Sequence, residues 1–169
     1  YKVERSPSHI WRAYYEKNGT KFATGIGGDD KCGIYACLTL LSRLPKLKCA
    51  FYVDEEAGCM GSGYSDIAWY DDCRWVIQVD RRGCTDIITS GMGIDMCSPE
   101  FTKEAERVGF KWGFRECVGV YTDVTFLKGD QGLPISAINL SAGYYNAHSP
   151  NEYIVEKDLM KAISFCEAM

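Results

Sequence analysis

The chain has 169 residues, of which 46% are apolar and 25% are charged, a make-up typical of one soluble globular domain. No run approaches the roughly 20 consecutive apolar residues of a membrane-spanning helix, and residues 1–9 lack the apolar core of a signal peptide. The net charge is −4 and the Lys and Arg residues are scattered. We therefore expect neither a membrane protein nor a nucleic-acid partner.

The nine cysteines are odd in number and contain no C-x-x-C pair. This pattern argues against a disulfide scaffold, a zinc ribbon and a thioredoxin-like centre. Reduced thiols in a cytoplasmic protein are the simpler interpretation. Cys37, Cys49 and Cys166 lie among apolar neighbours, so we predict that they are small core residues.

Three helices are predicted. Residues 33–44 carry apolar side chains at helical spacing (Ile34, Cys37, Leu38, Leu41 and Leu44), and the stretch ends at Pro45. Ser98 is the expected N-cap of a surface helix that begins at Pro99. Residues 155–169 place Leu159, Ile163 and Cys166 on one face of a closing helix.

Short apolar runs predict strands at 47–53, 74–79, 85–90 and 134–141. Because strands alternate with helices, we predict an α/β fold with three layers: a mixed, mostly parallel central sheet with helices on both faces. There is no repeat or linker, so residues 1–169 are expected to form a single catalytic domain. In open sheets of this kind, ligands bind at the carboxyl ends of the strands.

Hard metal-ligand side chains occur at four separate places. Asp29 and Asp30 follow two glycines, Glu55 and Glu56 follow a predicted strand, Asp80 follows another, and His148 lies in a late loop. Each place alone has an ordinary interpretation: a helix cap, a solvated strand end, a surface ion pair, or a surface histidine. Together, several carboxylates and one imidazole suit a borderline divalent ion such as zinc, cobalt or manganese.

Four segments in the same order carry a family resemblance. GIGGDDKCG resembles the bridging-aspartate segment of the M20 and M28 zinc exopeptidases, the group that contains peptidase T and the bacterial leucyl aminopeptidases. FYVDEEAGCMGS, VIQVD and GLPISAINLSAGYYNAHSPNEYI are similar to the metal-ligand segments that follow in that family. The four segments run in order from Gly25 to Ile154, so the resemblance covers most of the chain, and four ordered motifs are more specific than any single one.

The resemblance implies a site for two zinc ions, with cobalt or manganese as alternatives. Asp29 would bridge the ions and be joined to Asp30 by a cis peptide bond. Glu56 and His148 would complete one metal site, and Asp80 would belong to the other. Glu55 would act as general base for a metal-activated water that attacks the carbonyl group of a peptide substrate. Asp123 matches a position where some of these peptidases have an acid near the substrate's amino end; a loop acid is the alternative.

Two departures from the family affect the expected activity. Only 67 residues separate Asp80 from His148, so we expect no lid or dimerisation domain there. The family also has a strand ending in His-x-Asp before the bridging aspartate, and we expect this segment to be absent. His9 stands in that region but is followed by Ile10 and Trp11, which favours a surface role.

The leading hypothesis is a metal-dependent, aminopeptidase-like exopeptidase. One alternative is a catalytically incomplete relative that binds a peptide or protein, and another is a related amidase or deacetylase. A Cys-His hydrolase using Cys32 and His148 is disfavoured, because neighbouring aspartates oppose formation of the thiolate.

Overall fold

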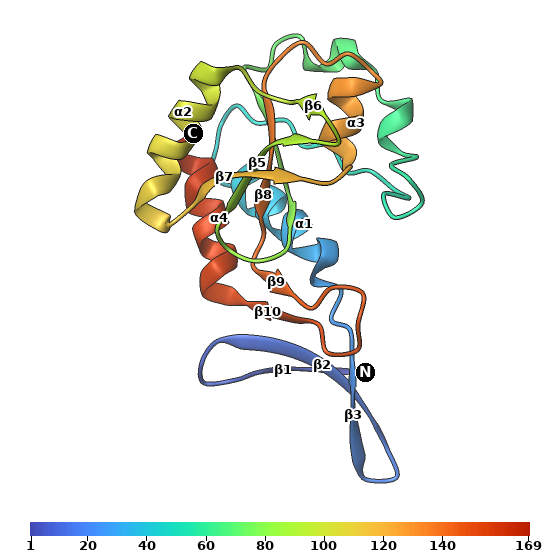
Figure 1. Ribbon diagram of the computed structural model, residues 1–169. Coiled ribbons are helices and arrows are strands. Elements are labelled where there is room, and N and C mark those ends of the chain that lie inside the picture. The colour runs from blue at the N-terminus through green and yellow to red at the C-terminus, as the bar shows by residue number, and fades with distance from the viewer. The chain divides into compact units, whose positions relative to one another are not determined.

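The structure of the protein is a computed structural model that describes all of residues 1–169. The chain divides into two compact units. The first unit comprises Tyr1–Leu47, Val79–Thr85 and Ser141–Met169, and the second comprises Lys48–Gln78 and Asp86–Leu140. The α/β class predicted from the sequence is confirmed, with two sheets and four α-helices (Figure 1).

The first unit contains an antiparallel five-stranded sheet. Its order is β1-β2-β10-β9, and β3 also pairs with β2. The strands are β1 (Lys2–Arg5), β2 (Ile10–Lys17), β3 (Thr20–Thr24), β9 (Tyr144–Tyr145) and β10 (Tyr153–Val155). Pairing of β2 with β10 joins the beginning of the chain to its end, and β9 and β10 flank the loop that carries His148 (Figure 1).

No strand was predicted before residue 47, but the structure has three there: β1, β2 and β3. Asn18 and Gly19 connect β2 to β3 with φ angles of 51° and 75°. An Asn-Gly pair with two positive φ angles is the preferred two-residue turn of a β-hairpin. The alternation in IWRAYYEK before Asn-Gly was therefore a hairpin signal.

Helices α1 (Gly28–Leu41) and α4 (Glu156–Ala168) pack against each other in the first unit, as Figure 1 shows. Both were predicted, and α1 ends before Pro45 as expected. The buried face of α1 is formed by Cys32, Ala36 and Leu40, whereas the predicted row of Ile34, Leu38 and Leu41 is exposed. The helix is apolar on several sides, so its periodicity did not identify the core face.

The second unit contains most of a mixed sheet in the order β4-β8-β5-β6, with β7 paired to β5. The pair β5–β7 is parallel, while β5–β6 and β5–β8 are antiparallel. The strands are β4 (Val76–Arg81), β5 (Asp86–Gly91), β6 (Ile94–Asp95), β7 (Arg115–Gly119) and β8 (Ala137–Ser141). The predicted strands at 74–79, 85–90 and 134–141 are thus confirmed as β4, β5 and β8.

The predicted strand at 47–53 is wrong, since these residues form no ladder. Phe51 and Val53 are exposed. Apolar and aromatic residues favour a strand only where a neighbouring strand supplies hydrogen bonds and a packing surface. The acidic residues that follow therefore extend from an irregular segment rather than from a strand end.

Two helices complete the second unit. Helix α2 (Pro99–Gly109) is confirmed together with its cap, because the Ser98 hydroxyl accepts a hydrogen bond from the Phe101 amide at 3.2 Å. Helix α3 (Asp123–Gly129) was not predicted. The short 3-10 helices are η1 (Ser62–Tyr64), η2 (Ile67–Tyr70) and η3 (Phe110–Trp112). The core of this unit is formed by Tyr70, Ile88, Met96, Val124, Leu127, Leu133 and Ala137.

None of the nine cysteines forms a disulfide bond. Cys32 and Cys59 are the buried ones, while Cys37, Cys49 and Cys166 are only half-buried. None of the helices has the length and apolar character that crossing a membrane requires.

Candidate metal centre

A tight backbone turn presents Asp29 at the start of α1. Gly27 has a φ of 71°, a conformation that glycine adopts without steric cost. A Cβ on Gly28 would lie 2.7 Å from the Cβ of Tyr144, so a side chain at that position would clash. The peptide bond between Asp29 and Asp30 is cis, which confirms the expectation. The Asp30 carboxylate accepts a hydrogen bond from the Gly33 amide at 2.8 Å, on the inner side of the helix start.

The carboxylate of Glu152 holds this turn. Its Oε2 accepts a hydrogen bond from the Gly27 amide at 2.6 Å, and its Oε1 accepts one from the Asp29 amide at 3.0 Å. Glu152 is only 4% exposed. A buried carboxylate is costly unless hydrogen bonds compensate for lost hydration, and here two backbone donors do so. Glu152 therefore fixes the backbone from which the Asp29 side chain projects.

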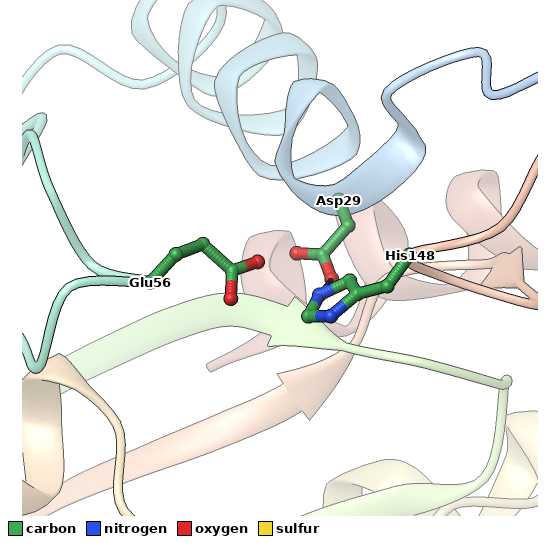
Figure 2. Close-up of side chains that lie close together, drawn as sticks. All are labelled: Asp29, Glu56 and His148. Carbon is green, nitrogen blue, oxygen red and sulfur yellow. Dashed lines mark hydrogen bonds and ion pairs between the residues drawn. The ribbon is translucent and has the colours of Figure 1, made fainter.

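His148 lies beside Asp29. Its Nε2 is 3.0 Å from Asp29 Oδ2, and the ring and the carboxylate point toward each other in Figure 2. The imidazole is 63% exposed and the Asp29 side chain 18% exposed, so solvent reaches the pair from the histidine side. Two ligands of one tetrahedral zinc ion lie about 3.3 Å apart, given metal–ligand bonds near 2.0–2.1 Å. The Asp29–His148 pair fits such an ion.

Asp80, near the end of β4, is oriented by a tyrosine. The Tyr144 hydroxyl donates a hydrogen bond to Asp80 Oδ1 at 3.2 Å. Burial raises the pKa of Tyr144, and the carboxylates of Asp80, Asp29 and Asp30 raise this pKa further. Tyr144 therefore keeps its proton and acts as a donor.

The pKa of the Cys32 thiol is affected by the same group of carboxylates. The thiol is 1% exposed, and burial is the main reason that its pKa lies far above the usual value. Four carboxylates add to the shift of that pKa: Asp30, Glu152, Asp29 and Asp80. The thiolate is thus strongly disfavoured, which argues against the Cys-His hydrolase.

Glu55 and Glu56 lie on a compact loop of the second unit, which we call the acidic loop (residues 54–63). Backbone amides of Gly58 and Cys59 donate to the Glu55 carbonyl at 3.0 and 2.8 Å, and the Gly61 amide donates to the Val53 carbonyl at 3.0 Å. Glu55 is half-buried and Glu56 exposed. The loop therefore keeps a defined turn although no strand precedes it.

His9 has the surface role that the sequence favoured. It lies in the turn between β1 and β2, where its ring contacts Arg5, and its Nδ1 is 3.6 Å from the Glu156 carboxylate. Arg5 also forms an ion pair with Glu156 at 2.6 Å and holds the pKa of that carboxyl at about 2, well below its usual value. His9 therefore belongs to a surface ion-pair network.

Two residues of this centre received no role from the sequence. Glu152 belongs to the HSPNEYI segment and Tyr144 to the SAGYYN segment, so both lie inside a motif that pointed to His148. Their partners are 64 to 125 positions away, and only the fold brings them together.

Solved structures of aminopeptidases share this fold. The TET1 peptidase of Pyrococcus horikoshii is 20% identical with a TM-score of 0.61, and the match covers 93% of this chain and 52% of that one. The aminopeptidase APDkam598 of the archaeon Desulfurococcus kamchatkensis is 22% identical, with a TM-score of 0.63 and coverages of 93% and 50%. The aminopeptidase PepT of Bacillus cereus is 13% identical, with a TM-score of 0.66 and coverages of 99% and 74%.

The fold is that of these aminopeptidases. The chain spans about half the length of the first two proteins, since it covers 52% and 50% of them. No protein-family model and no curated protein sequence matches the chain.

Proposed function

We propose that the protein is a metal-dependent exopeptidase of the aminopeptidase type, related to the M20 and M28 zinc exopeptidases, in which residues 1–169 form one catalytic domain. The observation that carries the proposal is the pair of Asp29 and His148, with Oδ2 and Nε2 3.0 Å apart. An imidazole beside a carboxylate, with a buried glutamate behind it, is a donor arrangement that suits a divalent ion of the zinc class. The aminopeptidase fold gives independent support.

The ligands are proposed from the motifs and from the donor set. Asp29 would be shared by two ions, His148 and Glu56 would bind one of them, and Asp80 would bind the other. Zinc is the proposed metal, with cobalt or manganese as alternatives. Such ions, when bound, lower the pKa of water and polarise the carbonyl group of a peptide.

The other residues have defined tasks in this proposal. Glu55 takes the proton from the attacking water and passes it to the amine that leaves when the peptide bond breaks. Tyr144 orients Asp80 through its hydroxyl, and Glu152 fixes the backbone of Asp29. Supporting groups of this kind hold metal ligands in one orientation and increase their affinity for the ion. The proposed substrate is a peptide with a free amino end.

The chain offers a matched test, because it has only two histidines. Zinc titration by calorimetry should show tight binding for the wild type and for His9→Ala, and its loss for His148→Ala. Hydrolysis of an aminoacyl amide should follow the same order. Equal zinc affinity in all three proteins would refute the assignment of His148. Tight zinc binding without hydrolysis would favour the alternative of a peptide-binding relative.

A further inference from the structure

A cavity of about 370 Å³ opens on the surface of the second unit, beside the end of α2 and the start of β7. The helix and the strand pack against each other there (Figure 1). Small-molecule sites in proteins have volumes of about 300–1,000 Å³, so the cavity is large enough for a small ligand. None of its lining residues belongs to the proposed metal centre. They are Lys103, Glu106, Arg107, Phe110, Phe114 and Arg115.

Two phenylalanines supply the apolar part of the cavity. Gly113 has a φ of 83°, and its amide donates to the Phe110 carbonyl at 3.0 Å. The next amide, that of Phe114, donates to the Gly109 carbonyl at 3.1 Å, so the chain turns back past the end of α2. Phe114 is 2% exposed, whereas Phe110 is 74% exposed. The exposed ring offers apolar surface that a ligand can remove from water.

Three basic residues line the same cavity. Arg107 already has a partner, because its guanidinium donates to both carboxylate oxygens of Glu104 at 2.7 and 2.6 Å. Lys103 and Arg115 are exposed and form no ion pair. The cavity therefore presents two positive charges that remain available to an anion, although the chain as a whole has a net charge of −4.

We propose that this cavity binds a small amphiphilic anion, namely a carboxylate attached to a ring or a branched alkyl group. A guanidinium presents two parallel N–H donors to a carboxylate, so Arg115 would bind this group together with Lys103. The apolar group would cover the ring of Phe110. Glu106 is the one acid of the lining, and with the two unpaired cations it leaves one positive charge in excess. That excess matches a monoanion better than the dianion of a phosphate monoester.

Binding of 3-phenylpropionate to the full chain tests the proposal. Titration of the ¹⁵N-labelled protein, followed by NMR, should give saturable shifts of the amides of residues 103–115. Two related compounds separate the contributions of charge and ring. The amide 3-phenylpropanamide lacks the charge, and acetate lacks the ring. Each should bind at least about tenfold more weakly, because a hydrogen bond to a charged group and burial of a phenyl ring each contribute at least that factor.

Three variants locate the site. Arg115→Gln and Phe110→Ala should each weaken binding of 3-phenylpropionate by about tenfold or more. Both side chains are exposed, so the variants should keep the fold, and the same NMR spectra report this. Arg74→Gln is the matched control. It removes one positive charge from an exposed arginine of the same unit that lies over the Trp75 ring, outside the cavity, and should leave the affinity unchanged.

The outcomes that would overturn the proposal differ from those expected in kind. Shifts that do not saturate, or equal affinity for 3-phenylpropionate and acetate, would show that the cavity is not an amphiphilic site. An equal loss in Arg115→Gln and Arg74→Gln would show attraction by overall charge alone. Tighter binding of phenyl phosphate than of 3-phenylpropionate would refute the assignment to a monoanion. Binding is measured without turnover, so none of these results depends on the proposed function of the metal centre.

Discussion

Glu152 Oε1 accepts a hydrogen bond from the backbone amide of Asp29, 123 positions earlier in the chain. The other oxygen, Oε2, binds the amide of Gly27. The last loop of the chain therefore holds the turn that begins α1, and the same loop carries His148. One carboxylate links the backbone of one proposed ligand to the segment that bears the other.

Replacing Glu152 should destabilise the protein and weaken metal binding together. Glu152→Ala leaves two backbone donors without their acceptor, and each buried unsatisfied donor costs about 1–3 kcal/mol. Glu152→Gln keeps one acceptor oxygen and should lose less. Urea unfolding in a chelator measures stability, and calorimetry measures zinc affinity. Glu167→Ala, which removes an exposed ion pair with Arg43, is the control and should change stability by less than about 1 kcal/mol.

Tyr144→Phe should weaken binding of the proposed second ion. The change removes the hydroxyl that donates to Asp80 and leaves the ring in place. Loss of a group that orients a metal ligand lowers affinity by about 10- to 100-fold. Tyr145→Phe is the matched control, because the neighbouring hydroxyl donates to Asp158 instead, at 2.7 Å. An equal loss in both variants would show that Tyr144 does not act through Asp80.

Local sequence signals predicted much of the fold. The confirmed features depend on residues that are adjacent in the sequence. They are the N-cap at Ser98, the end of a helix before Pro45, and the strands predicted from the apolar runs at 85–90 and 134–141. The prediction of a strand at 47–53 was wrong because an apolar pattern favours extended backbone but does not supply a neighbouring strand to pair with. The core face of α1 was predicted wrongly for a related reason: a row of apolar residues on a helix does not identify the element that packs against it.

The residues of the candidate centre also fall into those that local motifs predicted and those that they did not. The sequence predicts Asp29, Asp80, His148, Glu55 and Glu56 as site residues because their motifs are short and ordered along the chain. Glu152 and Tyr144 act through pairings between residues 64 to 125 positions apart, and Asp123 differs from other acids only by burial of its carboxyl group. No short motif encodes either feature.

Glu55→Gln should separate catalysis from metal binding. Glu55 is proposed to transfer a proton and not to bind an ion, so the variant should keep the zinc content of the wild type. Turnover should fall by about 10²–10⁴, the contribution of a positioned proton-transfer group. Glu56→Gln should show the opposite pattern, with loss of metal first. Metal analysis of both proteins and an aminoacyl-amide assay make the comparison; near-full activity of Glu55→Gln would refute its role.

Ionisation of Asp123 should contribute to the pH dependence of the unfolding free energy. Burial raises the pKa of this carboxyl above its ordinary value of 3.8 in the folded protein. Between the unfolded and folded pKa values, the folded state binds more protons than the unfolded state, so this group makes stability fall as pH rises above about 4. Asp123→Asn cannot ionise, and its unfolding free energy should fall less over that interval. Urea unfolding at a series of pH values above 4 tests this, with Asp130→Asn as the control that keeps the wild-type slope. A wild-type slope in Asp123→Asn would show that Asp123 ionises in the folded protein as readily as in the unfolded chain.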